Sequence, residues 1–262
     1  KSSTYFEPDS SVPFIIVAGR KFNFGKFNGE PAVYVLAGSP MANVAVTVQL
    51  MFDNLPIKGI ISYGAAATVS NQVFIADVVV PSQVAFTSVW KWEKYDESDN
   101  MDTTTLNIGE YNVPKAGENY LGQIEFKKTQ MFTPTSSKKS VYWFDVHSEW
   151  VQLASQINFG IQSNVHIGGD YRIGSSDIHL SNVAFATFLN KQLNVTAVDT
   201  TSAAVVSASI ANGVPHIVFR GTSKRPGTQS DSELSETTGK NVLKAVAAFV
   251  GNLSPKTYTN VY

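Results

Sequence analysis

Short, β-branched apolar runs alternate along this sequence with longer segments of helical periodicity, and that alternation constrains the fold more than any other feature. The short runs occupy residues 14–17, 32–36, 59–63, 73–80, 195–198 and 216–219. Because they lack strict apolar–polar alternation, they are typical of strands buried on both faces. The segments of helical spacing are 42–52, 146–157, 182–189, 202–211 and 239–253. The pattern predicts an α/β fold, a single-domain α/β/α sandwich with a mostly parallel central sheet flanked by helices.

Residues 90–135 depart from this alternation. Aromatic side chains stand there among Asp, Asn and Gly, namely Trp90, Trp92, Tyr95, Tyr111, Tyr120, Phe126 and Phe132. We interpret the segment as an ordered insertion with an aromatic core. No Gly/Ser or Pro-rich linker divides the 262 residues, so we predict one domain, 1–262, that contains this insertion.

The charge balance argues against nucleic acid and membrane partners. The chain has 20 Lys and Arg against 21 Asp and Glu, a formal net charge of −1. Binding by phosphate neutralisation needs a basic face, and the densest basic stretches here are pairs such as Lys138-Lys139. No apolar run reaches the roughly 18 residues that a membrane-spanning helix needs.

Several familiar catalytic and metal sites are missing from the sequence. With no cysteine, the chain has no thiol nucleophile and no thiolate metal ligand. The four histidines do not pair at the i, i+4 spacing of a helical zinc site, so we expect no metal. Neither a Gly-x-Ser-x-Gly elbow nor a phosphate-binding loop is present. His216, within an apolar run, is interpreted as a buried structural histidine.

Small and polar residues follow several of the predicted strands. They occupy residues 38–43, 64–68, 168–171, 199–202 and 220–224. In parallel α/β sheets, ligands bind beyond the carboxyl ends of the strands, where small residues let backbone N–H groups approach an anion or a heterocycle. The same residues also make tight strand-to-helix turns without a ligand. Because five such ends occur together, we predict a pocket.

Four segments of the sequence, in order along the chain, resemble the nucleoside phosphorylase and nucleosidase superfamily. They are residues 59–66, 75–80, 194–204 and 213–223. Residues 89–95, 109–112 and 121–126 look specifically like its plant branch, which includes bark storage, vegetative storage and wound-inducible proteins and some cytokinin riboside phosphorylases. The resemblance covers residues 12–253 and implies the α/β/α fold of that superfamily.

The resemblance implies a chemistry, cleavage of the bond between a purine and ribose by phosphate or water. In the family, an Asp after the Ser of an Arg-x-x-Ser-Asp motif protonates the leaving base, and a Glu in an Asp-Met-Glu-Ser-Ala-Ala motif holds the ribose hydroxyls. Here Lys224 follows Ser223 at the position of the acid, and Thr201 stands at the position of the Glu, with Thr200 in place of Met. Ser223 and Lys224 are therefore the candidates for the catalytic positions.

These exchanges weaken the implied chemistry. A positioned general acid contributes about 10²–10⁴ in rate, and a hydrogen bond to a charged partner contributes about 1.5–3 kcal/mol. Together these two effects predict a catalytic rate about 10³–10⁶ times lower than that of an intact enzyme. An ammonium is a poorer proton donor than a carboxylic acid, and its charge would lie near a cationic sugar. A lysine of lowered pKa, or one that binds phosphate, would rescue part of the loss.

The resemblance also implies the residues that bind the nucleoside. They are Ser39, Gly64, Ala65, Ala66, Tyr171, Thr200 and Thr201. Tyr171 is the candidate for stacking on the base, with Arg172 as the competing position and a surface tyrosine as the alternative interpretation. No cofactor is implied, and phosphate is a co-substrate if the protein is active.

Three functions remain open at this point. The first is a plant storage or wound-inducible protein that keeps a purine or nucleoside pocket with weakened or lost cleavage. The second is an active purine nucleoside phosphorylase or nucleosidase with rearranged catalytic residues. The third is a defence protein that binds sugars or another protein through residues 90–135. They are distinguished by whether the protein releases a free base, and by whether Trp90 or Trp92 is needed to bind a glycan.

The remaining expectations concern assembly and location. Family members form homo-oligomers, so we expect one here. Asn194 and Asn252 begin N-glycosylation triplets, the second of which is weakened by Pro255. With them, a plant protein of this kind is expected to be secreted or vacuolar.

Overall fold

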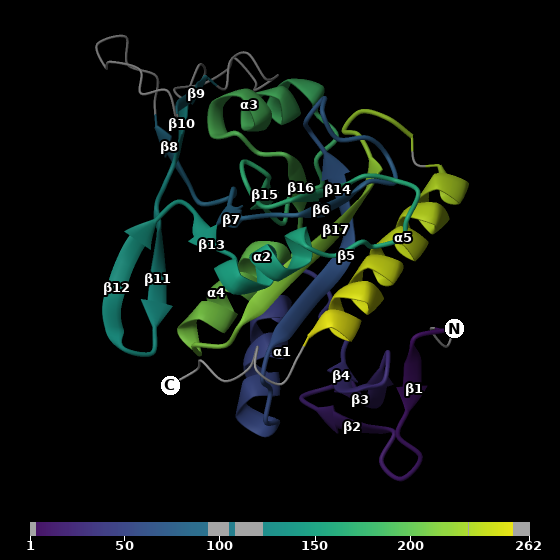
Figure 1. The fold of residues 1–262 in the computed structure, drawn as a ribbon. Helices are drawn as coiled ribbons and strands as arrows, with labels where there is room; N and C mark the ends of the chain where they lie inside the picture. The colour runs from purple at the N-terminus through teal and green to yellow at the C-terminus, as the bar shows by residue number, and fades with distance from the viewer. Residues whose placement is uncertain (1–3, 94–104, 108–122, 230, 254–262) are drawn as a thin grey trace.

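The computed structural model describes residues 4–93, 105–107, 123–229 and 231–253. The centre of this described part is a curled, mixed eight-stranded sheet (Figure 1). In spatial order its strands are β13 (Phe144–Asp145), β7 (Gln83–Phe86), β15 (Arg172–Ser175), β16 (Ala197–Asp199), β5 (Ile60–Thr68), β17 (His216–Lys224), β6 (Val78–Val80) and β14 (Val165–Ile167). The pairs β7–β15, β15–β16, β5–β17 and β6–β14 run parallel, and the others run antiparallel. The α/β prediction is confirmed, and parallel pairs are in a narrow majority.

Helices flank this sheet in the described part of the chain. They are α1 (Met41–Asn54), α2 (Ser148–Ser155), α3 (Val183–Leu193), α4 (Ser202–Ala211) and α5 (Ser232–Asn252). Figure 1 shows α5 running along β17 and β5, while α4 packs near β15 and β7 with α1 against it. Within the described ranges, none of these helices combines the length and the apolar character that crossing a bilayer requires.

Helix α5 begins seven residues before the predicted start at residue 239. Its first two turns, Ser232–Thr238, are mostly polar and so lack the apolar periodicity on which the prediction depended. The start is instead defined by an N-cap. The Asp231 carboxylate accepts hydrogen bonds from the backbone N–H groups of Glu233 (2.9 Å) and Leu234 (3.1 Å).

The prediction that residues 14–17 and 32–36 are strands of the central sheet is wrong. They contribute to β2 (Phe14–Val17) and β4 (Glu30–Tyr34), which join β1 (Phe6–Pro8) and β3 (Arg20–Phe27) in a separate antiparallel sheet. Ile15 packs toward the cluster around α1, whereas Ile16 is 65% exposed. One face of this sheet is therefore solvated, as antiparallel sheets allow, although both faces carry apolar residues. Likewise, only residues 78–80 of the predicted strand 73–80 are extended, because a turn occupies the residues before them.

Several segments of the predicted insertion form strands in the described part of the chain. In it, β8 (Trp90–Glu93), β10 (Gln123–Phe126) and β9 (Thr105–Asn107) form an antiparallel sheet, and β11 (Thr129–Thr133) pairs with β12 (Ser136–Val141). Phe126 is buried and stacks on Phe188 of α3 at a centroid distance of 5.9 Å, whereas Phe132 is exposed. Tyr95, Tyr111 and Tyr120 lie outside the described residues, so the aromatic core of the insertion stays a prediction.

Strand β17 lies unusually close to α5 because Gly221 has no side chain. A Cβ built at this residue would be 2.4 Å from Cγ2 of Thr238 and 2.5 Å from Cγ2 of Val242, both on α5. Both neighbours are buried and β-branched, so neither side chain can move away easily. The close approach fixes the carboxyl end of β17 against the helix.

We expect Gly221→Ala to lower the free energy of unfolding by about 1–3 kcal/mol, because the added methyl overpacks the β17–α5 contact. Urea unfolding followed by circular dichroism measures the change. Gly239→Ala is the matched control, since that glycine lies within α5 with no atom within 4 Å of the added Cβ. It is expected to stabilise the protein by about 0.5–1 kcal/mol. Equal effects of the two substitutions would contradict the close packing.

Candidate functional site

A cavity of about 470 Å³ lies where β5, β16 and β17 meet the loops before α1 and α3. Several residues predicted for the site line it together, namely Ser39, Ala65, Ala66, Thr200, Ser223 and Lys224. Pro40, Ala67 and Asp199 also line it and belong to the strand-end segments from which a pocket was predicted, whereas five lining residues were not predicted: Asp177, Ile178, His179, Leu180 and Val198. At this place β5 has a parallel neighbour on one side and an antiparallel neighbour on the other. The cavity also lies beyond the carboxyl ends of β16 and β17, and ligands of α/β sheets usually bind outside the carboxyl ends of strands.

A bulge in β17 brings two consecutive residues to the cavity. Side chains alternate between the two faces of a regular strand, so Ser223 and Lys224 would ordinarily point in opposite directions. The register with β5 shifts between Thr222 and Lys224, and this shift lets both residues line the same space. Bulges commonly reorient side chains next to functional sites. Thr222, before the shift, is fully buried and donates from its hydroxyl to the carbonyl oxygens of Phe74 and Asp77.

A buried ion pair supports one wall of the cavity. Nε of Arg220 donates to Oδ2 of Asp199 at 2.5 Å, and each side chain is only 2% exposed. Asp199 also accepts hydrogen bonds from the hydroxyls of Ser175 (2.5 Å) and Ser202 and from the backbone N–H groups of Thr201 and Ser202 (both 3.2 Å). The pair thereby connects β15, β16, β17 and the start of α4.

The environment of Asp199 keeps its carboxylate charged. Burial raises the pKa of Asp199, but the positive charge of Arg220 and the hydrogen bonds from Ser175, Ser202 and Arg220 together outweigh it. The pKa therefore lies below the usual value for an aspartate. A carboxylate held this way is neutralised by its partner and is a poor proton donor at neutral pH.

The hydroxyl of Thr201 is committed to the same network. Nη2 of Arg220 donates to Oγ1 of Thr201 at 2.6 Å, and that hydroxyl lies 3.4 Å from Oδ2 of Asp199. Thr201 is not among the residues that line the cavity, whereas its neighbour Thr200 is. The same Nη2 of Arg220 also donates to the hydroxyl of Ser62 on β5 at 2.8 Å. The structure thus places Thr201 in the wall of the site.

Lys224 supplies a positive charge to the cavity. It is half-buried, and its ammonium makes no ion pair or hydrogen bond with any residue that the structure describes. Asp177, across the loop before α3, is exposed and accepts a hydrogen bond from the backbone N–H of Met41 at 2.8 Å. His179 of the same loop is also exposed. Sequence reasoning missed this loop because β15 before it is short and contains Gly174, without a long apolar run.

Most of the sequence matches a family model. A family model described as the phosphorylase superfamily matches residues 2–253. The chain belongs to this superfamily. Bark storage protein A of Populus deltoides is 32% identical to this superfamily member over 266 residues, which cover 97% of the chain and 84% of the storage protein. Bark storage protein B of the same species matches with the same identity and coverage.

More distant similarities point to nucleosidases. A 5'-methylthioadenosine/S-adenosylhomocysteine nucleosidase of Listeria monocytogenes is 26% identical over 138 residues, 51% of this chain and 54% of the enzyme. The crystal structure of the Streptococcus pneumoniae MTA/SAH nucleosidase in complex with 8-aminoadenine gives a TM-score of 0.67 at 16% identity, covering 93% of this chain and 91% of that one. Futalosine hydrolase of Helicobacter pylori gives 0.66 at 17% identity, covering 92% and 88%. These structures establish that the superfamily member has the nucleoside phosphorylase type of fold.

Besides Thr201, two predicted site residues, Gly64 and Tyr171, do not line the cavity. Gly64 of β5 does not line it; a Cβ there would be 3.3 Å from Nη1 of Arg220, so this glycine leaves room for the guanidinium. The hydroxyl of Tyr171 lies 3.3 Å from Nδ1 of His166, whose Nε2 lies 2.8 Å from Oδ2 of Asp77. The structure therefore does not bring Tyr171 to the cavity, because Tyr171 precedes β15, whereas the cavity is lined by residues 177–180, which follow that strand. Ile178 and Leu180 are the larger apolar side chains on the cavity wall.

His216 is 4% exposed, as a structural histidine would be. Its ring nitrogens lie 2.9 Å from the carbonyl oxygen of Val214 and 3.2 Å from that of Asp145. Burial lowers the pKa of His216, although the two carbonyl oxygens oppose this shift. The ring is remote from the cavity lining and holds the start of β17 against β13.

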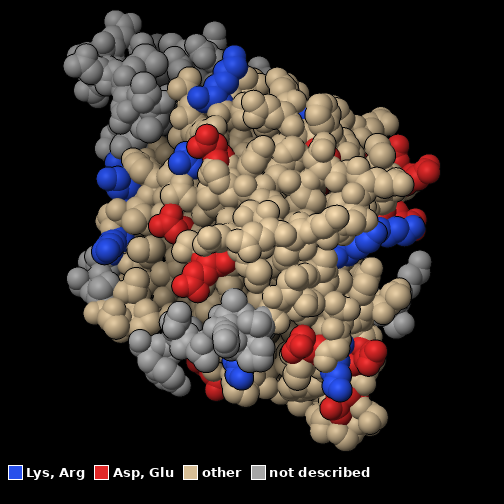
Figure 2. Space-filling view, viewed as in Figure 1, with Lys and Arg blue, Asp and Glu red and all other residues tan. Residues whose placement is uncertain are grey.

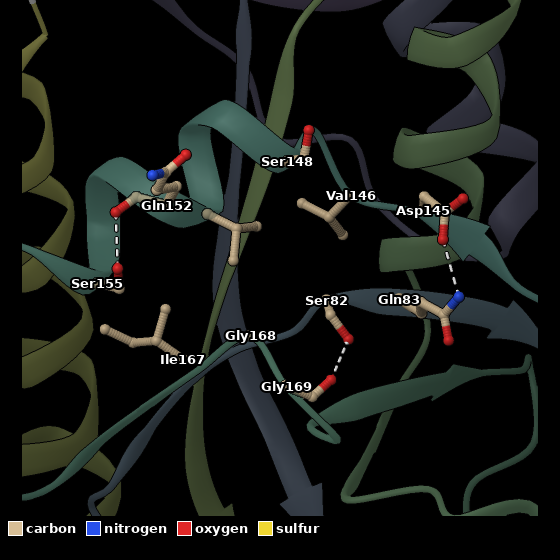
Figure 3. Close-up of a pocket in the computed structure, with 11 residues that line it drawn as sticks. Ser82, Gln83, Asp145, Val146, Ser148, Gln152, Ser155, Ile167, Gly168 and Gly169 are labelled. Atoms are coloured by element: carbon tan, nitrogen blue, oxygen red, sulfur yellow. Dashed lines mark hydrogen bonds between the residues drawn. The ribbon is translucent and has the colours of Figure 1, made fainter.

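A second, larger cavity of about 610 Å³ lies between α2 and the start of β7 (Figure 3). Its polar groups bond largely to each other: Ser82 donates to the carbonyl of Gly169 at 2.7 Å, and the Gln83 amide donates to Asp145 at 2.8 Å. Among the residues that the structure describes, no lysine, arginine or histidine lines it. The space-filling view shows charges of both signs scattered over one face of the molecule (Figure 2). The smaller cavity, with its unpaired cation, is therefore the better candidate site.

We expect Arg220→Met to lower the free energy of unfolding at pH 7 by about 3–5 kcal/mol, because Asp199 then stays buried without a counter-ion. Losing the guanidinium raises the pKa of Asp199 relative to the native protein. The deficit is therefore complete above the pKa of Asp199 in the variant and shrinks as the pH is lowered through it. Urea unfolding at several pH values measures this.

The matched control is Lys240→Met, which removes the exposed ion pair between Lys240 and Glu236 on α5 (2.7 Å). That substitution should leave the unfolding midpoint unchanged, because exposed pairs contribute little. If Arg220→Met lowered the free energy of unfolding no more than the control does, the structural role of the buried pair would be contradicted.

Proposed function

We propose that this superfamily member is a bark-storage-type protein, of the vegetative storage or wound-inducible kind, that keeps a purine or nucleoside pocket with weakened or lost N-glycosidic cleavage. The single observation that carries the proposal is the chemistry of the cavity at the carboxyl end of β17. Lys224, a cation with no acceptor capacity, lines it, and Asp199, a buried carboxylate in the same lining, is neutralised by Arg220. The similarity to the bark storage proteins over 97% of the chain supports the same function.

The retained pocket is supported by its shape and by the proteins that share the fold. A volume of about 470 Å³ falls within the usual range for small-molecule sites. The similar nucleosidase of Streptococcus pneumoniae was crystallised with 8-aminoadenine. Ile178 and Leu180 offer an apolar surface against which a flat base could pack. Binding needs only such a surface and a few hydrogen bonds, so it can persist where catalysis does not.

Loss of cleavage follows from what is missing at the reacting centre. The leaving base requires a proton, and the developing sugar cation is favoured by negative charge. Lys224 places positive charge there instead, and the Thr201 hydroxyl already accepts a hydrogen bond from Arg220. The site therefore lacks, at these two positions, the groups that would stabilise the transition state more than the bound substrate.

The test compares release of free base from inosine and adenosine by the native protein and by Lys224→Asp. The native protein is expected to bind nucleoside in a calorimetric titration while releasing base far below the ordinary enzymatic range of about 1–10³ s⁻¹. Restoring a carboxyl group at this position should raise the rate by about 10²–10⁴. Lys224→Met is the matched control, because it removes the ammonium without adding an acid and should leave the rate low. Turnover by the native protein at an ordinary rate would overturn the proposal.

Asp177 favours a second candidate function, an active phosphorylase or nucleosidase with rearranged catalytic residues. Its carboxylate lines the cavity. Among the described residues, only the backbone N–H of Met41 donates a hydrogen bond to it, to Oδ1, so the second oxygen is available. It could supply the proton that Lys224 does not, with water or phosphate as the attacking group. If the native protein is active, Asp177→Asn should abolish the activity, and phosphate dependence separates a phosphorylase from a nucleosidase. Full activity of Asp177→Asn would exclude this arrangement.

The proposal includes a homo-oligomer and a secreted or vacuolar location. Large apolar side chains exposed on the N-terminal sheet and its surroundings support association, among them Leu36 (88% exposed), Ile16 and Tyr34. Asn194, at the C-cap of α3, and Asn252, the last residue of α5, are both exposed and thus accessible to a glycan. Light scattering of the purified protein and mass spectrometry of these two residues test the two statements.

A further inference from the structure

The larger cavity, between α2, the start of β7 and the loop after β14, has a wall that is held from behind. The Ser82 hydroxyl donates to the carbonyl oxygen of Gly169 at 2.7 Å, and the Ser82 N–H donates to that of Tyr171 at 3.0 Å. The Tyr171 hydroxyl lies 3.3 Å from Nδ1 of His166, whose Nε2 lies 2.8 Å from the buried carboxylate of Asp77. These contacts hold the loop without a ligand. The space of about 610 Å³ is therefore preformed, and its volume is usual for a small-molecule site.

Hydrogen-bonding capacity remains on both sides of this cavity. On one side, Asp145 accepts from the Gln83 amide through Oδ1, which leaves Oδ2 of Asp145 and Oε1 of Gln83 without a partner among the described residues. On the other side, Ser148 and Gln152 of α2 line the cavity, and neither side chain bonds to a residue in the described ranges. Figure 3 shows Val146 between Gln152 and the Gln83–Asp145 pair. A ligand that spans the cavity can use acceptors on one side and groups that both donate and accept on the other.

The charge of the cavity disfavours an anion. Asp145 is a lining residue, and Glu149 adds a second carboxylate in the first turn of α2. Over the described part of the chain, the lining includes no positive side chain. A phosphate or carboxylate group would therefore meet repulsion here and no counter-ion.

A cation matches the remaining groups less well than a hydroxyl does. An ammonium only donates, so it could satisfy Asp145 but not the N–H groups of Gln152. Asp145 is also exposed, and pairs of exposed charges contribute little. A hydroxyl both donates and accepts, so a molecule with several hydroxyls can use Asp145, Gln152 and Ser148 together.

The floor of the cavity is apolar. Val146 is 3% exposed, Val151 and Ile167 are half-buried, and all three belong to or pack against the main hydrophobic core. A sugar ring carries C–H groups on its faces and hydroxyls around its rim. The C–H groups of such a ring can cover the aliphatic floor while the hydroxyls reach the polar groups at the sides.

We propose that the cavity between α2 and β7 binds a neutral carbohydrate of one or two sugar units. Gln152 and Asp145 bind its hydroxyls from opposite sides. The site does not depend on the proposed purine pocket, because the two linings share no residue. It also differs from sugar binding through Trp90 or Trp92, since each of its lining residues lies outside the segment 90–135.

Titration with glucose, galactose, maltose and sucrose, followed by calorimetry and NMR, tests the site. At least one of these sugars should bind with a Kd of about 1 mM or below, as expected of a small polar ligand in an open cavity. Gln152→Leu should raise this Kd by about twofold to tenfold, because it removes the amide and keeps a good helix former. Asp145→Asn should raise it by about fivefold to tenfold, because a neutral acceptor replaces a charged one.

Two control variants locate the binding. Gln156→Leu is the matched control, since this exposed glutamine at the C-cap of the same helix does not line the cavity. Lys224→Met alters the smaller cavity instead. Both should leave the Kd for the sugar unchanged. Urea unfolding of each variant shows that its fold is intact.

Four outcomes decide the proposal. If none of the four sugars binds at about 10 mM, the proposal is overturned. It is also overturned if Gln152→Leu and Asp145→Asn both keep the native Kd, because the sugar then binds elsewhere. Putrescine is the probe for a cation, and tighter binding of this diamine than of any sugar, lost in Asp145→Asn, would overturn the neutral ligand. Sugar binding in a protein that binds no purine would support this site and refute only the purine pocket.

Discussion

The buried ion pair between Asp199 and Arg220 is the interaction on which the site depends. Taking two charges out of water costs several kcal/mol each, and the pair is stable only if the remaining hydrogen-bonding capacity is used. Here it is used by Ser62 of β5, Ser175 of β15 and Ser202 of α4, so the strand ends are joined by polar contacts within an apolar surrounding. Because the network is closed, the strands that line the cavity hold one arrangement relative to each other.

The fold was predictable where local pattern and burial coincide. The runs at 59–63 and 216–219 are apolar because β5 and β17 lie in the middle of the central sheet, and both were predicted correctly. The runs at 14–17 and 32–36 have the same composition but form a half-exposed antiparallel sheet. Nothing local distinguishes the two cases, since the difference is which strand each run pairs with, a long-range property. The polar start of α5 was missed for the opposite reason, because its stability derives from an N-cap and not from an apolar face.

The site was predictable as a set of strand ends but not as a geometry. Strand-end reasoning and the family resemblance named Ser39, Ala65, Ala66, Thr200, Ser223 and Lys224, which line one cavity. The bulge that turns both Ser223 and Lys224 inward has no signal in the sequence. Arg220 lies in the segment 213–223 that carries the family resemblance. Its pairing with Asp199 depends on β16 and β17 flanking β5, which the sequence does not show. Tyr171 was assigned by its position after a glycine pair, and that glycine pair follows an edge strand.

The exchange at residue 201 has a consequence for stability as well as for chemistry. With a hydroxyl at this position, the cluster contains one carboxylate and one guanidinium and is neutral. A glutamate there would place a second carboxylate near the same guanidinium, leaving a partly buried negative charge to be compensated by a ligand. Functional sites often keep such unsatisfied groups at a cost in stability. Thr201 therefore leaves a closed network that is satisfied without substrate, which is consistent with the storage function proposed above.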